Sequence, residues 1–150
     1  MKNSLPALTR IIEQMLAILL FSMFALVTIL VVLRYVFTTT IIGGNEATVI
    51  AFIFTTAIGA SVAIARDEHI AIDYFVLKLP QALQRKIAVV RLLLLILINA
   101  AIMLYAFEWI ERTGGFLMPT LGAPQMLAQI SVPIGCALSI IYCVARLFER

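Results

Sequence analysis

Hydrophobic residues fall along this chain in four long stretches that are almost free of charge. The uncharged runs cover residues 14–33, 47–65, 92–107 and 113–145. A helix that crosses a bilayer needs roughly 20 mostly apolar residues, with about 17 as the lower limit. The third run is short, but it lengthens to 87–107 if Arg91 lies near the interface and turns its head group to water. The pattern predicts an all-α integral membrane protein with transmembrane helices over residues 15–36, 47–65, 87–107 and 126–145. We expect these helices to form a single membrane domain over residues 1–150.

The composition agrees with a lipid environment. The chain has 150 residues, of which 63% are hydrophobic and 13% are charged. Soluble domains carry about 25% charged residues. The excess apolar surface therefore needs lipid rather than a larger core.

The chain changes character between the second and third predicted spans. Four ionisable residues, Arg66 to His69, follow the apolar run directly, and Asp73 comes soon after. Apolar positions from Ile72 to Leu83 then recur within about a third of a helical wheel. This pattern predicts a short amphipathic helix over about residues 70–79 that lies in the membrane interface. Pro80 is expected to end it and to begin the third membrane helix.

The basic residues predict the orientation of the chain in the membrane. Arg34 and Arg112 lie in the two segments on one side of the four spans, whereas the other basic residues lie on the opposite side. Those are Lys2, Arg10, Arg66, Lys78, Arg85, Lys86, Arg91, Arg146 and Arg150. Because cytoplasmic segments carry an excess of Lys and Arg, both termini and the middle connection are expected to be cytoplasmic. A role in binding nucleic acid is not expected, since the basic residues follow a membrane boundary and form no DNA-binding motif.

Two charged residues flank the first predicted outer loop. Arg34 ends the first span, and Glu46 opens the second, where Asn45 is expected to cap the helix. A carboxylate in the first turn of a helix matches the positive end of its dipole. Arg34 and Glu46 are therefore candidates for an ion pair or for contacts to a partner on this side.

The spans themselves contain few polar side chains. Small residues recur every four positions at Ala57, Ser61 and Ala65 in the second span, which predicts close packing against another helix. Asn99 lies in the middle of the third span, where an amide facing lipid would be unsatisfied, so we expect it to bond to another helix. Arg91 is expected to reach the interface or to pair with a carboxylate on another chain.

Few residues in the spans suit catalysis or transport by the chain alone. The spans carry no pair of carboxylates, and the sequence suggests neither a Ser/His/Asp set nor a metal-ligand cluster. Cys136 and Cys143 lie seven residues apart on one helix face and are expected to be small packing residues. We therefore expect no enzyme activity, no metal and no cofactor. An accessory membrane subunit remains as the main hypothesis.

The order of motifs resembles a known family, the DctQ-like small membrane subunits of tripartite ATP-independent periplasmic (TRAP) transporters. The resemblance rests on Arg34-Tyr-Val-Phe37, on Glu46, on the block from Gly59 to His69 with Ile72-Asp73, and on Leu79-Pro80. The chain departs from the family where a tryptophan and two adjacent acids often precede the second span. Here Gly43 stands at the tryptophan position, and Asn45-Glu46 replaces the acid pair.

The resemblance implies a multi-pass subunit in the bacterial inner membrane. Such a subunit pairs with and stabilises a large elevator-type permease that imports an organic acid, such as a C4-dicarboxylate or sialic acid, with sodium. A periplasmic binding protein delivers that substrate. Under this resemblance, Arg66, Glu68, His69 and Asp73 become candidate subunit contacts, together with Arg91 and Asn99 from the preceding argument. Arg34 and Glu46 become candidate contacts to the binding protein.

Two other functions remain open at this point. One is a small homodimeric, proton-coupled multidrug exporter in which Glu13 is the coupling acid, which would require Glu13 to lie inside the bilayer. The other is a membrane enzyme or redox protein that uses Cys136, Cys143 or His69. Arg10 lies three residues before Glu13, so a solvated or ion-paired surface carboxylate is the simpler interpretation.

Overall fold

The chain is all-helical in the computed structural model, which describes residues 4–66 and 80–148. Its helices are α1 (Ser4–Val36), α2 (Gly44–Arg66), α4 (Gln81–Thr113), α5 (Met126–Gln129) and α6 (Ser131–Phe148). Four segments are long and apolar enough to cross a membrane, namely Thr9–Val36, Gly44–Arg66, Leu83–Thr113 and Met126–Phe148. The four predicted spans are therefore confirmed. Each helix extends beyond its predicted span, because hydropathy marks the apolar middle of a helix and not its polar turns.

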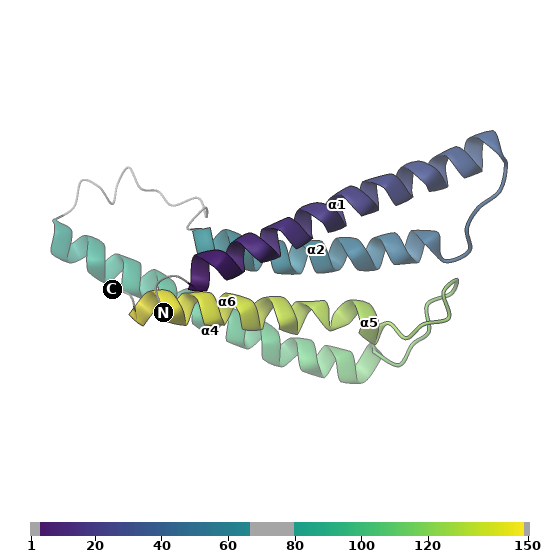
Figure 1. The fold of residues 1–150 in the computed structure, drawn as a ribbon. Helices are drawn as coiled ribbons and strands as arrows, with labels where there is room; N and C mark the ends of the chain where they lie inside the picture. Colours follow the sequence, from purple (N-terminus) through teal and green to yellow (C-terminus); the bar gives the residue numbers. More distant parts are fainter. Residues whose placement is uncertain (1–3, 67–79, 149–150) are drawn as a thin grey trace.

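The membrane helices pack side by side in the order α1, α2, α6, α4, as Figure 1 shows. The α2 helix contacts both α1 and α6, and α6 also contacts α4. Half of the most apolar part of the segment Met126–Phe148 is buried, against at most 17% in the other three segments. The helices thus form a row in which α6 lies between α2 and α4.

The buried core lies where α2, α4 and α6 meet. Ile64, Leu92 and Cys143 form its centre. Leu95, Ile96 and Leu147 pack against this centre. Ser61 and Ser139 are also buried, and each hydroxyl donates to a carbonyl of its own helix. These bonds satisfy polar groups that would otherwise be costly in an apolar interior.

Both described ends of the chain lie at the same end of the molecule (Figure 1). The last turn of α2 and the first turns of α4 are also at this end, and the α1–α2 and α4–α5 loops are at the other. This arrangement fits four crossings. We call the end with the two loops the outer end and the opposite one the inner end. The predicted interfacial helix over residues 70–79 lies outside the described residues.

The fourth segment is interrupted before Pro133. The α5 helix ends at Gln129, and α6 begins at Ser131. Proline has no N–H group for the carbonyl four residues earlier, which here belongs to Gln129, and its ring crowds that carbonyl. The sequence positions of Pro133 and Gly135 predict a kink in the fourth helix, and the structure has a break between α5 and α6 about one turn before Pro133.

Candidate functional site

The two outer loops are joined through the Glu46 carboxylate. Glu46 lies in the first turn of α2, as predicted, although α2 begins at Gly44, so Asn45 lies within the helix and is not its cap. The N–H group of Thr120 donates to Oε1 at 3.0 Å, and that of Leu121 donates to Oε2 at 2.6 Å. A carboxylate that accepts two backbone N–H groups fixes the position of the loop that carries them.

The backbone of the α1–α2 loop also approaches this second loop closely. Gly43 has a φ of +80°, and a Cβ atom there would lie 2.8 Å from Leu121 Cδ1. The second loop folds back on itself, since Met118 N–H donates to Ala123 O and Gln125 N–H donates to Phe116 O. Glycine at position 43 is therefore favoured by its backbone conformation, and a larger residue there would also have to displace the Leu121 side chain.

Arg34 lies apart from this contact. It is exposed in the last turn of α1, and no ion pair joins it to Glu46 in the described part of the chain. Of the two possibilities that the sequence leaves open for Arg34 and Glu46, the ion pair between them is therefore not formed within the described residues, and contacts to a partner stay a prediction. The Glu46 carboxylate accepts hydrogen bonds from within the chain, whereas the Arg34 side chain is exposed on the surface.

An ion pair joins α1 to α2 near the inner end. Arg66 Nη2 donates a hydrogen bond to Glu13 Oε2, and Arg66 Nε forms an ion-pair contact with Glu13 Oε1. The Arg66 side chain is 50% exposed and that of Glu13 is 24% exposed, so the pair lies at the edge of the helix packing. Glu13 is thus an ion-paired residue, as the sequence suggests, but its partner is Arg66 on α2 rather than the neighbouring Arg10.

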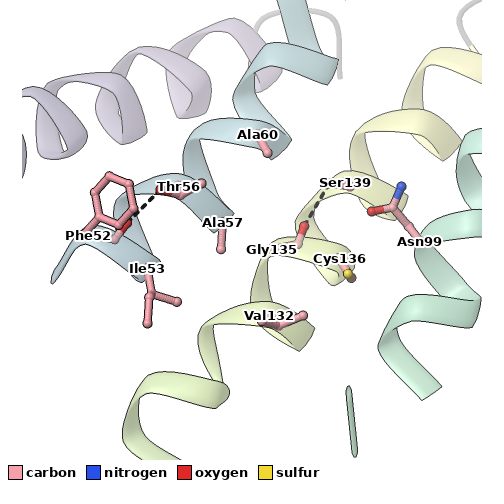
Figure 2. Close-up of a pocket in the computed structure, with 10 residues that line it drawn as sticks. All are labelled: Phe52, Ile53, Thr56, Ala57, Ala60, Asn99, Val132, Gly135, Cys136 and Ser139. Carbon is pink, nitrogen blue, oxygen red and sulfur yellow. Dashed lines mark hydrogen bonds between the residues drawn. The ribbon is translucent and has the colours of Figure 1, made fainter. Parts of the chain in front are cut away.

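A groove opens between α2, α4 and α6 in the middle of the membrane segments. Its volume is about 360 Å³, and Figure 2 shows its lining side chains: Phe52, Ile53, Thr56, Ala57 and Ala60 from α2, Asn99 from α4, and Val132, Gly135, Cys136 and Ser139 from α6. At the base of the groove, the backbones of α2 and α6 approach each other closely. A Cβ atom on Gly135 would lie 2.7 Å from the Ala57 carbonyl oxygen.

Asn99 faces this groove and bonds to its own helix. Its Nδ2 donates to the carbonyl of Leu95 at 2.8 Å. No donor reaches its Oδ1 from the described residues. The expected bond from Asn99 to another helix is thus not formed within this chain, and for a partner helix it stays a prediction. Arg91 is half-buried eight residues earlier on the same helix.

The remaining predicted site residues divide into two groups. Glu68, His69 and Asp73 lie outside the described residues. Cys136 and Cys143 are both free thiols and both buried, as expected of packing residues. Among the described residues, no group of three His, Cys, Asp or Glu side chains is arranged to hold a metal ion.

A family model places this helical arrangement among known proteins. Residues 23–150 match the model described as "Tripartite ATP-independent periplasmic transporters, DctQ component". The chain belongs to the DctQ family. A search of curated proteins found no match.

Family membership makes this DctQ chain a small membrane subunit of a TRAP transporter, as the motifs suggest. With four helices apolar enough to cross a bilayer, it is a multi-pass protein of the inner membrane. It is a transporter component and not an enzyme by family.

Sequence reasoning identified Glu46 and Asn99 but missed their surroundings. The donors to Glu46 are backbone N–H groups from a loop 74 and 75 residues away, and backbone groups leave no signal in the side-chain pattern. The groove was missed because α2 and α6 are far apart in sequence. The small residues Gly135 and Ser139 on α6 carry the signal that would have indicated it.

Proposed function

We propose that this DctQ subunit is an accessory scaffold that pairs with and stabilises a large elevator-type permease. The observation that carries the proposal is the family match over residues 23–150. The row of helices supports it, because a row leaves long flanks for a neighbour, whereas a closed bundle turns its packing surfaces inward.

The transported substrate in this proposal is an organic acid, such as a C4-dicarboxylate or sialic acid, imported with sodium. A periplasmic binding protein delivers it to the membrane subunits. The small subunit holds neither ion nor substrate, and it enlarges the fixed part of the permease. The termini and the connection between α2 and α4 are cytoplasmic in this arrangement, as the distribution of basic residues indicates.

The candidate contacts to the permease at the inner end are Arg66, Glu68, His69 and Asp73, together with Arg91 on α4. At the outer end, Arg34 is the better candidate for a direct contact to the binding protein, because its side chain is exposed. The Glu46 carboxylate already accepts two hydrogen bonds from Thr120 and Leu121. Its contribution at this end is to position the loop.

Co-purification and uptake together test this function. An affinity-tagged chain from its native membrane should bring down the large permease, and deletion of its gene should abolish sodium-dependent uptake of the organic acid. Recovery of the chain alone, with uptake unaffected by deletion, would contradict the proposal.

The inner-end contacts have their own test. Asp73→Ala and His69→Ala should lower the amount of co-purified permease more than they change the affinity for substrate. Lys86→Ala, at an exposed position near the start of α4, is the control. Normal co-purification with altered substrate affinity would instead place these residues at the transport site.

A further inference from the structure

The break between α5 and α6 leaves several backbone groups without a helical partner. Ile134 N–H donates to Ile130 O, which is the first backbone bond after the break. The N–H groups of Ser131 and Val132, just before it, reach no acceptor among the described residues. Pro133 has no N–H group, so the carbonyl four residues earlier also receives no helical donor. In the apolar part of a membrane protein, such groups need hydrogen-bond partners.

The side chain of Gln129, the last residue of α5, adds an acceptor at the same place. Gln129 is only 4% exposed, and its Nε2 donates one of its two hydrogens to Thr113 Oγ1 at 2.8 Å. The Thr113 hydroxyl itself donates to the Trp109 carbonyl at 2.9 Å, so it can only accept from Gln129. This arrangement directs Nε2 toward Thr113, and the buried Oε1 receives no hydrogen bond from the described part of the chain.

The groups at the break call for a molecule that both donates and accepts hydrogen bonds. A metal cation would suit the oxygens but would face the N–H groups of Ser131 and Val132, and an anion would suit only the N–H groups. Acyl chains offer neither donors nor acceptors. A side chain of another subunit is too large to reach Oε1, because Ala128, Gln129 and Ser131 are all buried inside this chain. Water fits, since buried water typically makes about three hydrogen bonds to groups that would otherwise be unsatisfied.

We propose that a water molecule is bound at the break between α5 and α6, where it donates a hydrogen bond to Gln129 Oε1. The backbone groups of residues 129–132 are the candidates for its other hydrogen bonds. Proline removes only one of the missing helical bonds, because Ser131 and Val132 keep their N–H groups. Water inserted among the backbone groups accounts for the others, as it does at other helix kinks. The inference goes beyond the proposed function and does not depend on it.

A high-resolution structure tests the site directly. The full chain in lipid nanodiscs, enlarged by a bound antibody fragment, can be imaged by electron cryomicroscopy at a resolution that shows ordered water. We expect a density about 2.7–3.2 Å from Gln129 Oε1, and it should remain when sodium in the buffer is replaced by choline. The absence of density at Oε1, or a protein donor in its place, would overturn the inference. A density that disappears without sodium would identify a cation site instead.

Two variants separate the water from the neighbouring hydrogen bond. Gln129→Met has a similar shape but lacks the acceptor, so the density should be lost. Thr113→Val is the matched control, because it removes the bond to Nε2 and leaves Oε1 in place, so the density should remain. Density that persists in Gln129→Met would show that Gln129 does not bind this water. If Gln129→Met does not fold, the wild-type map and Thr113→Val still decide the proposal.

Discussion

At the scale of single residues, Glu46 joins the two outer loops, because its carboxylate accepts hydrogen bonds from a loop in the other half of the chain. Glu46→Ala removes both acceptors of the Thr120 and Leu121 N–H groups. We expect hydrogen exchange of these two amides to become roughly tenfold faster, with a smaller effect for Glu46→Gln, which keeps one acceptor oxygen. Hydrogen–deuterium exchange read by mass spectrometry on a peptide that covers residues 116–122 measures this directly.

The control for this prediction is Glu111→Ala. Glu111 is an exposed acid near the same end of the molecule and accepts no hydrogen bond from the described part of the outer loop. Its loss should leave the exchange of Thr120 and Leu121 unchanged. Equal acceleration in both variants would mean that general charge at the outer end, rather than the Glu46 contact, holds the loop.

The sequence predicted where Glu46 lies but not what it does. Its place in the first turn of α2 follows from the sequence, since acids favour that position. Its hydrogen-bond partners cannot be predicted in the same way, because every loop has backbone N–H groups. Only the folded structure shows which loop lies next to Glu46. The same limit applies to Glu13, whose nearest basic residue in sequence is Arg10 but whose partner in the structure is Arg66.

The Glu13–Arg66 pair separates two functional hypotheses. A half-exposed ion pair typically contributes about 0.2–1 kcal/mol, so Glu13→Gln should lower the free energy of unfolding by no more than that. Uptake of the organic acid should persist in this variant. A double-mutant cycle with Arg66→Gln, followed by thermal unfolding in detergent, measures the coupling. Abolished transport with unchanged stability would instead assign Glu13 the role of a coupling acid.

At the scale of the helices, α2 and α6 cross so closely at Gly135 that a larger side chain there would meet backbone atoms. A Cβ atom on Gly135 would lie 2.7 Å from the Ala57 carbonyl oxygen, and backbone atoms cannot move aside as a flexible side chain can. Gly135→Ala should therefore push the helices apart and cost about 1–3 kcal/mol. Thermal unfolding in detergent, followed by the fluorescence of Trp109, measures the loss.

Gly59→Ala provides the matched control for this crossing. A Cβ atom on Gly59 has nothing within 4 Å, and the residue lies in the interior of α2. Alanine is better than glycine in a helix by roughly 0.5–1 kcal/mol, so this variant should be as stable as the wild type or slightly more stable. A loss of stability in both variants would show that the Gly135 contact is not the cause.

The sequence showed that α2 packs closely against a helix, but it left the neighbour open. Ala57 and Ser61 are small residues at helical spacing. Such a row indicates that another helix packs closely against α2, but it does not indicate which helix. In the structure, α6 lies against Ala57 at Gly135, and α1 packs on another part of α2. The positions of the membrane spans were predictable from hydropathy, and the start of α4 from Pro80, whereas helix neighbours depend on contacts between residues far apart in sequence.

For the protein as a whole, orientation links the fold to the proposed function. The outer loops can meet a periplasmic binding protein only if both chain termini are cytoplasmic, as the basic residues predict. Gly115 follows the C-terminus of α4 and Arg85 lies near its N-terminus, and both are exposed, so Gly115→Cys and Arg85→Cys report on the two sides. The wild-type chain is the control, since Cys136 and Cys143 are buried and should react little.

A membrane-impermeant maleimide added to intact spheroplasts should label Gly115→Cys at once. It should label Arg85→Cys only after the inner membrane is opened. The reason is that position 85 belongs to the segments that hold nine of the eleven basic residues, and segments rich in Lys and Arg stay on the cytoplasmic side. The reverse pattern would place the Glu46 contact and Arg34 in the cytoplasm. A periplasmic partner could then reach neither, and the outer-end assignment would have to be given up even with the fold unchanged.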